Sequence, residues 1–149
     1  MRAVVQRVFA ASVIIEGSKR RDIGRGLVVL LGVGPKDGQK DIDYLVRKIV
    51  NLRLFPAVAG NASFDLSVKD IKGEILVVSQ FTLYADLRKG RRPDFAPAAP
   101  AHIAKPLYLS FVDQLNKIVP GIVTGEFGTN MLVDIQNQGP VTLLLDTAV

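Results

Sequence analysis

The chain has 149 residues, of which 48% are hydrophobic and 22% charged, so we expect one globular domain over residues 1–149. It has no cysteine, and no apolar run reaches the roughly 18 residues of a membrane span, which excludes disulfides and zinc–thiolate sites and predicts an unexported, cytoplasmic protein. Lysine and arginine number 19 against 14 acidic residues, and the charge of +5 is compatible with an anionic partner without identifying one.

The first apolar segments of the chain predict strands. Residues 3–8 and 12–15 alternate in character around a short interruption, which predicts a hairpin with a tight turn near residues 9–11. Residues 27–31 are continuously apolar, which is typical of a central strand that is covered on both faces.

A helix is predicted next. Apolar residues recur with helical spacing over about Gln39–Asn51, and Asp37 or Asp41 stands near the N-terminus of this segment. Residues 52–55 then predict a strand. Residues 56–64 are rich in glycine and alanine and lack periodicity, which indicates a loop.

The second half of the chain predicts further strands and one more long helix. The helix is indicated by apolar residues from Tyr108 onward, and Pro106 either occupies its first turn or kinks a helix begun near Pro100. In total, seven or more strands and two long helices favour a mixed α+β sheet packed by helices over a doubly wound parallel fold. The strands of this half are predicted at residues 74–80, 121–124, 131–136 and 141–146.

Two common kinds of site find little support in the sequence. The single histidine, His102, has no neighbouring Ser or Asp pattern, which favours a solvated side chain near a helix start over a catalytic triad. The acidic residues are scattered, without the spacing of a ligand set, so we expect no metal site.

Residues 32–38 lie between a predicted strand and a predicted helix, where a phosphate-binding glycine loop would lie. However, Gly38 comes one residue late for a dinucleotide fingerprint, and the Gly-Lys-Ser/Thr ending of a P-loop is absent. An ordinary strand-to-helix turn is therefore favoured, and nucleotide binding is the minor alternative.

Residues 79–82, Ser-Gln-Phe-Thr, form the polar end of an apolar strand. Two hydroxyls and an amide at a strand end, where the backbone turns and exposes its N–H groups, indicate a candidate site. The alternative is a polar strand terminus with Phe81 in the core. Gly139 and Pro140 lie between two predicted strands and, taken alone, indicate a turn.

Several segments in order resemble the D-aminoacyl-tRNA deacylases. The two signature segments are Ser-Gln-Phe-Thr-Leu at residues 79–83 and Asn-Gln-Gly-Pro-Val-Thr at residues 137–142. Because linked segments are more specific than one motif, and these cover essentially the whole chain, the resemblance has more weight than either signature alone. The supporting segments are residues 6–8, 11–13, 26–33, 52–55, 85–86, 92–95 and 125–128, with Met131.

The resemblance implies a homodimer of mixed, largely antiparallel sheets in a barrel-like arrangement packed by two long helices. It implies hydrolysis of the ester that joins a D-amino acid, or glycine on a non-cognate tRNA, to the terminal adenosine, without a cofactor or a metal. The expected partners are therefore aminoacyl-tRNA and a second copy of the chain.

The resemblance also assigns residues to the site. The catalytic group is Ser79, Gln80, Phe81 and Thr82, and the substrate-binding group is Arg7, Phe127, Gly128, Gly139 and Pro140. By the same resemblance the Gly139-Pro140 bond is expected to be cis and to reach into the partner's pocket, held partly by Arg7. There it would occupy the space of an L side chain while admitting a D side chain or glycine.

For the chemistry, we expect backbone N–H groups around Phe81 and Thr82, with the Gln80 side chain, to stabilise the oxyanion of acyl transfer to water. A nucleophilic Thr82 hydroxyl would need a base that the neighbouring sequence does not supply. We therefore favour assistance by the ribose 2′-hydroxyl of the tRNA, with Ser79 and Thr82 as positioning groups.

The basic residues Arg88, Lys89, Arg91 and Arg92 are expected either to contact acceptor-stem phosphates or to form a solvated loop.

Two rival functions remain: a same-fold deacylase of mischarged L-aminoacyl-tRNA, and a non-catalytic RNA-binding domain. Some residues depart from the family pattern, which bears on pocket dimensions and substrate preference. They are Gln138, Thr129, Asn130, Pro106 and the loop at residues 61–66, which differs in length or sequence.

Overall fold

The computed structural model describes residues 1–58 and 63–148. The described part contains eight strands, two α-helices and one 3-10 helix, η1. In chain order the elements are β1 (Arg2–Ile15), β2 (Lys19–Ile23), β3 (Gly26–Gly32), α1 (Gln39–Asn51), β4 (Arg53–Phe55), β5 (Leu66–Ser67), β6 (Glu74–Ser79), η1 (Phe81–Tyr84), α2 (Ala101–Ile118), β7 (Val123–Thr124) and β8 (Met131–Asp146).

Six strands form one mixed sheet, with the order β2-β1-β3-β6-β7 and with β8 paired to β1. β1 is antiparallel to β2, β3 and β8, whereas β6 is parallel to β3 and β7. The sheet curls so that β2 approaches β7, where Arg21 Nη1 donates to the Thr124 carbonyl at 2.6 Å. The predicted α+β class is confirmed, with a nearly closed, barrel-like and largely antiparallel sheet and two helices.

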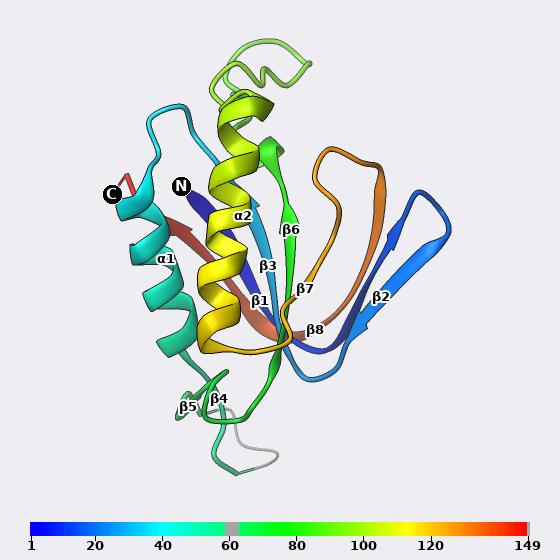
Figure 1. Cartoon of the computed structure of the whole chain (residues 1–149), viewed down its shortest axis with the longest axis vertical. Coiled ribbons are helices and arrows are strands. Elements are labelled where there is room, and N and C mark those ends of the chain that lie inside the picture. The colour runs from blue at the N-terminus through cyan, green and yellow to red at the C-terminus, as the bar shows by residue number, and fades with distance from the viewer. Residues whose placement is uncertain (59–62, 149) are drawn as a thin grey trace.

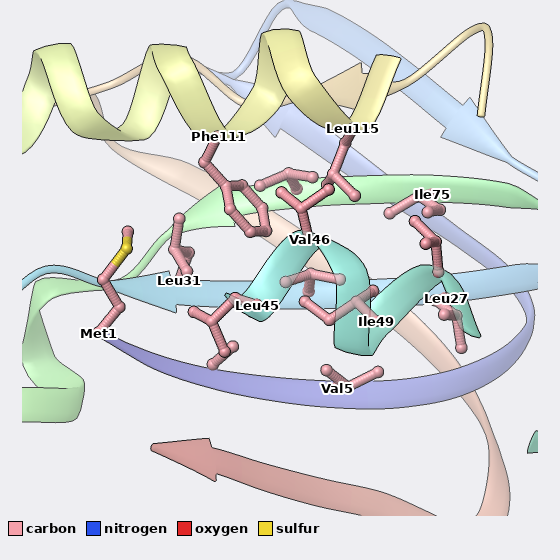
Figure 2. Close-up of a cluster of buried hydrophobic side chains, with 14 of the residues drawn as sticks. Met1, Val5, Leu27, Leu31, Leu45, Val46, Ile49, Ile75, Phe111 and Leu115 are labelled. Atoms are coloured by element: carbon pink, nitrogen blue, oxygen red, sulfur yellow. The ribbon is translucent and has the colours of Figure 1, made fainter. Parts of the chain in front are cut away.

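Two hydrophobic clusters lie on opposite faces of the central strands. Both helices cover one face (Figure 1), where Val46 and Ile49 of α1 and Phe111 and Leu115 of α2 pack against β3 and β6 (Figure 2). Alternate residues of a strand point to opposite faces, so β3 and β6 contribute to both clusters, and burial of each large side chain contributes roughly 1.5–3 kcal/mol. The cluster inside the barrel consists of Val8, Ala11, Val13, Ile15, Ile23, Val28, Leu76 and Val78.

Helix α1 begins at Gln39 and ends at Asn51, as predicted. Its periodic apolar residues are buried together, which is the arrangement that the sequence spacing indicates. The Asp41 carboxylate lies in the first turn and accepts a hydrogen bond from the Gly38 N–H at 2.9 Å. An acidic group at this position also interacts favourably with the helix dipole.

Helix α2 begins at Ala101, directly after Pro100. Of the two predicted starts for this helix, the one near Pro100 is therefore correct. Pro106 therefore lies inside the helix, in its second turn. It cannot donate to the His102 carbonyl four residues earlier, so the helix lacks one hydrogen bond there.

The predicted hairpin at residues 3–15 is wrong, because these residues form the single strand β1. The interruption near residues 9–11 is an irregularity in the pairing with β8, where the register shifts on both sides of Val8. The real hairpin joins β1 to β2 through residues 16–18, in which Glu16 and Gly17 have φ angles of 47° and 73°. The sequence did not predict β2, because Lys19 and the next three residues are exposed and charged.

The two strands predicted at residues 131–136 and 141–146 are also one strand, β8. Gly139 and Pro140 do not turn the chain into a hairpin, because the segments on both sides of them pair with β1. They lie in the irregular part of this pairing, between Val8↔Asn137 and Gln6↔Thr142. A glycine and a proline here therefore mark a strand interruption and not a reversal.

The remaining predicted strands are confirmed with slightly different bounds: β3 extends one residue beyond residues 27–31 at each end, and β6 ends one residue before the predicted end at residue 80. β4 covers most of the strand predicted at residues 52–55, and β7 covers Val123–Thr124 of residues 121–124. The loop predicted at residues 56–64 lies partly outside the described residues, at 59–62. Neither described α-helix combines the length and the apolar character that crossing a bilayer requires.

Candidate active site

A cavity of about 680 Å³ lies at the carboxyl end of β6. Ser79, Gln80 and Phe81 line one side of it, and Phe127 and Gly128 line another. Five of the nine predicted site residues therefore surround one cavity. Ala101 and Ala104 from the first turn of α2, Met131 and Val133 of β8, and Glu16 complete much of the wall.

The chain turns sharply at the end of β6. The Gln80 N–H still donates to the Leu31 carbonyl of β3 at 2.7 Å, and η1 then begins at Phe81. A 3-10 helix pairs each N–H with the carbonyl three residues earlier, so the N–H groups of Phe81 and Thr82 have no acceptor inside η1. These are two donors at a strand end beside the cavity.

The side chains of this turn are fixed or exposed in distinct ways. Gln80 Nε2 donates to Thr82 Oγ1 at 2.5 Å, so the Thr82 hydroxyl oxygen is an acceptor in this geometry. Thr82 itself is partly buried and is not among the residues that line the cavity. Phe81 is 52% exposed, so the alternative that placed its side chain in the core is wrong.

The loop that carries Phe127 and Gly128 is held in place by a hydrogen bond within the loop and by a contact with Tyr108. Gly128 has a φ of 81°, and Thr129 Oγ1 donates to the Glu126 carbonyl at 2.9 Å. The Phe127 ring lies against the buried ring of Tyr108, with 5.7 Å between ring centroids and an interplanar angle of 51°. Tyr108 thus positions one wall of the cavity, a role that its helical spacing alone did not indicate.

The Tyr108 hydroxyl donates to the Val77 carbonyl of β6 at 3.0 Å. Burial raises the pKa of Tyr108 to about 12, so the phenol is neutral over the physiological range. The ring therefore acts as a neutral bridge between α2, β6 and the loop at Phe127.

Arg7, Gly139 and Pro140 do not line the cavity in this chain. The Gly139-Pro140 bond is cis, as the resemblance implies, and both residues are exposed. The Arg7 guanidinium is buried and donates to the Leu54 carbonyl at 2.5 Å, and it lies 5.9 Å from the centre of the Phe64 ring. Burial, and secondarily the charge of Arg25, lowers the pKa of Arg7.

The backbone of Arg7 lies opposite the interruption that contains Gly139 and Pro140. Arg7 is the β1 residue between the pairs Gln6↔Thr142 and Val8↔Asn137, so four β8 residues face it. With its amide oriented to satisfy both ends, Asn137 donates to the carbonyls of Arg7 and Val141 at 3.1 Å each. Asn137 thus clamps the interruption to β1. The Gln138 Oε1 and Arg7 Nε atoms are buried without a partner among the described residues.

The basic residues belong to a loop that closes on itself. Asp86 and Asp94 pair through their backbones, with N–H to carbonyl distances of 2.7 and 3.0 Å. Arg88 is held by the Asp86 carboxylate at 2.6 Å, and this hydrogen bond lowers the pKa of Asp86 to about 2. Lys89, Arg91 and Arg92 are exposed, and within the described residues none of them forms an ion pair.

The glycine loop at residues 32–38 uses its N–H groups internally. Asp37 accepts from the Gly34 N–H at 2.6 Å and from the Tyr84 hydroxyl at 3.2 Å, and it pairs with the Met1 ammonium at 2.8 Å. The Asp41 carboxylate takes the Gly38 N–H. Two donors that would hold a phosphate are thus bound to carboxylates, which disfavours nucleotide binding here.

His102 is exposed in the first turn of α2, as predicted. Among residues 1–58 and 63–148, no three His, Cys, Asp or Glu side chains are grouped closely enough to hold a metal ion. The polar side chains that line the cavity are those of Glu16, Ser79, Gln80, Thr129 and Asn130.

Comparison with known proteins identifies the family. The model of the D-Tyr-tRNA(Tyr) deacylase family matches residues 4–146. The D-aminoacyl-tRNA deacylases of Syntrophobacter fumaroxidans (strain DSM 10017 / MPOB) and Thermosipho africanus (strain TCF52B) are each 53% identical over 99% of this chain and 97% of their own. The solved structure of a c-Myc DNA unwinding element binding protein superposes with a TM-score of 0.91, at 47% identity and over 99% of both chains. The chain belongs to the D-Tyr-tRNA(Tyr) deacylase family.

Proposed function

We propose that this protein hydrolyses the ester of D-aminoacyl-tRNA and releases free tRNA and the D-amino acid, as a proofreading step of cytoplasmic translation. The observation that carries the proposal is the cavity formed by Ser79, Gln80 and Phe81 at the end of β6, in a chain of this family. Family members of high identity that are named D-aminoacyl-tRNA deacylases support the same reaction.

The catalytic step is attack of water on the ester carbonyl. The N–H groups of Phe81 and Thr82, which lack acceptors inside η1, stabilise the oxyanion, with the Gln80 side chain beside them. A single well-placed donor of this kind contributes about 10²–10³ in rate. Ser79 positions the substrate.

Thr82 is a positioning residue and not the nucleophile. Its oxygen accepts the Gln80 amide N–H, and a carboxamide donor cannot remove the hydroxyl proton. The single histidine of the chain, His102, does not line the cavity. We favour assistance of the attacking water by the ribose 2′-hydroxyl of the substrate.

Chiral selection comes from a second copy of the chain. Gly139 and Pro140 are exposed and lie away from the cavity of their own chain, which supports insertion into the pocket of a partner in a homodimer. Leu132 and Leu144 on the same strand are 60% and 67% exposed, which supports β8 as part of the contact. Gly-Pro then excludes L side chains, whereas a D side chain or glycine fits.

Arg7 keeps the Gly139-Pro140 segment in place through its backbone, because its carbonyl accepts the Asn137 amide that clamps the interruption. Its buried guanidinium anchors the same part of β1 to β4 through the Leu54 carbonyl. Phe127 and Gly128 bind the substrate from the opposite wall of the cavity.

The loop with Arg88, Lys89, Arg91 and Arg92 contacts acceptor-stem phosphates. Arg88 also orders the loop by pairing with Asp86, so Lys89, Arg91 and Arg92 supply the free charges. The contact is largely independent of sequence. In Arg91→Ala and Arg92→Ala variants, the slope of log KM against log salt concentration should fall by about one each.

The first experiment compares tRNA charged with D-tyrosine and tRNA charged with L-tyrosine. Rapid loss of the D ester alone is the expected result. Loss of both esters would indicate the rival L-aminoacyl-tRNA deacylase. Binding of the tRNA without loss of either ester would support the RNA-binding rival.

Assistance by the ribose is tested with D-tyrosyl-tRNA that ends in 2′-deoxyadenosine. The expected hydrolysis rate is at least 100-fold lower than with the normal ribose, by analogy with the removal of one catalytic group. An unchanged rate would exclude this role of the 2′-hydroxyl. Thr82→Ser and Thr82→Val variants, assayed with the normal substrate, separate the hydroxyl from the bulk of Thr82.

Subunit exchange tests the cross-subunit contact. A Pro140→Ala chain with an intact cavity should also hydrolyse the L ester. Excess of a second chain, which carries Gln80→Ala but intact Gly139 and Pro140, should suppress this L activity as mixed dimers form. If L activity persists despite demonstrated subunit exchange, Gly139 and Pro140 act elsewhere.

A further inference from the structure

Two aromatic side chains form a pair on the surface beside the cavity. The rings of Phe81 and Phe95 meet edge to face, with 5.0 Å between centroids and 68° between planes. Phe81 is 52% exposed and Phe95 is 37% exposed, so neither ring is buried by the contact. The pair therefore presents aromatic surface to the outside.

The pair stands between the cavity and the basic loop. Phe81 lines the cavity, while Phe95 directly follows Asp94, whose backbone closes the basic loop against Asp86. Figure 1 shows this segment beyond the end of β6 and next to the start of α2. A chain that leaves the cavity toward the basic loop would pass over the two rings.

The backbone at Phe95 is fixed on both sides. The Ala96 N–H donates to the Asp94 carboxylate at 2.9 Å, and the Ala98 N–H donates to the Phe95 carbonyl at 3.0 Å. Together with the Asp86 and Asp94 backbone pair, these bonds hold the Phe95 backbone in place, and the Phe95 ring packs against the Phe81 ring. A preorganised ring loses little freedom when a flat ligand covers it.

We propose that Phe81 and Phe95 form a stacking site for an unpaired nucleobase, that of the nucleotide preceding the 3′-terminal adenosine of the tRNA. This proposal rests on the proposed function, because the aminoacyl ester in the cavity fixes which nucleotide comes next. Aromatic rings beside cations are the usual means of holding a single-stranded nucleic acid, and the stacking tolerates any base.

The charges favour a nucleic acid over a protein as the ligand. The adjacent loop carries Lys89, Arg91 and Arg92, all exposed. Phosphates next to a stacked base would lie among these cations.

The test uses Phe95→Ala, with Leu87→Ala as the matched control, because Leu87 is 72% exposed in the same loop and outside the aromatic pair. For each variant, kcat/KM is measured with D-tyrosyl-tRNA and with D-tyrosyl-adenosine, which lacks the preceding nucleotide. For Phe95→Ala the ratio of the two values should fall about tenfold. Phe95→Tyr should restore it, and Leu87→Ala should retain it.

An equal fall with both substrates would overturn the proposal, because Phe95 would then only support the cavity. An unchanged ratio would overturn it as well. A changed sedimentation mass of Phe95→Ala would indicate that the ring contacts another copy of the chain, which also contradicts the proposal.

Binding keeps this proposal separate from the proposed activity. The ligand is the trinucleotide CCA with the fluorescent base 2-aminopurine in place of the middle cytosine. Stacking should quench its fluorescence with the unmodified protein and with Leu87→Ala, but not with Phe95→Ala. Quenching without ester hydrolysis would retain the stacking site and reject the activity, whereas hydrolysis without quenching would do the reverse.

Discussion

At the scale of residues, Tyr108 links the helix-covered core to the wall of the cavity. The Val77 carbonyl accepts both the Tyr108 hydroxyl at 3.0 Å and the Gly125 N–H at 3.1 Å. Loss of the hydroxyl would therefore leave that carbonyl with a partner. The ring has the larger role, because Phe127 rests on it.

Tyr108→Phe should lower the free energy of unfolding by only about 1 kcal/mol, the net contribution of one hydrogen bond. Tyr108→Ala should lower it by about 3–5 kcal/mol and should raise KM, because Phe127 loses its support. Urea unfolding and steady-state kinetics measure the two effects. Equal losses of stability in both variants would contradict the division between ring and hydroxyl.

The same residue predicts a loss of stability at alkaline pH. Burial raises the pKa of Tyr108 to about 12, above about 10 for an unfolded tyrosine, so the folded chain holds this proton more tightly. The contribution is complete below pH 10 and is lost as pH rises through 12. Chemical unfolding at pH 9, 10.5 and 11.5 should show a shallower decline for Tyr108→Phe, with Tyr44→Phe as the control. Identical slopes would contradict the assignment.

The residues at and around the cavity were predicted unevenly from the sequence. Ser79 to Phe81 were identified because polar residues at a strand end are a local signal, and Phe127 and Gly128 because of the family resemblance. The guanidinium partner of Arg7 was not predicted, because Leu54 is 47 positions away and a backbone carbonyl has no sequence signature. Tyr108 was placed on a helix, but its contact with Phe127 is equally nonlocal.

At the scale of elements, prediction succeeded where the signal is local. The helical spacing of α1 fixed both its ends. In β1 and β8 the alternation of side chains breaks, and the sequence alone does not distinguish a break caused by a turn from one caused by a pairing irregularity. Each of these two strands is continuous because it pairs with the other one, which lies far away in the sequence.

Gly26 illustrates how closely β3 and β6 approach. A Cβ at this position would lie 1.8 Å from the Glu74 carbonyl oxygen, its partner in the parallel pairing. Gly26→Ala should therefore separate the two strands and lower the free energy of unfolding by several kcal/mol. Gly38→Ala, with open space around its Cβ, should cost about 1 kcal/mol or less as a helix-cap change. Thermal unfolding measures both, and similar melting temperatures would refute the argument.

At the scale of the whole molecule, each active site of the proposed dimer includes Gly139 and Pro140 from the other chain. Leu144 is 67% exposed on β8, so Leu144→Arg should weaken self-association by adding a desolvated charge to an apolar contact. Sedimentation should give twice the 16.2 kDa chain mass for the unmodified protein and a concentration-dependent lower mass for the variant. Discrimination against L-tyrosyl-tRNA should decline in parallel. A stable dimer with Leu144→Arg would place the interface elsewhere.

Strand β1 pairs with β2 and β3 locally but with β8 across nearly the whole chain, for Arg2 lies opposite Asp146 and bonds its carboxylate at 2.8 Å. During synthesis on the ribosome, β1 emerges first. Its edge that pairs with β8 stays unpaired until residue 146 has left the exit tunnel. The sheet therefore closes after translation of that segment, and the nascent chain carries an open, apolar strand edge throughout. The sheet of this deacylase is therefore completed late in its own synthesis.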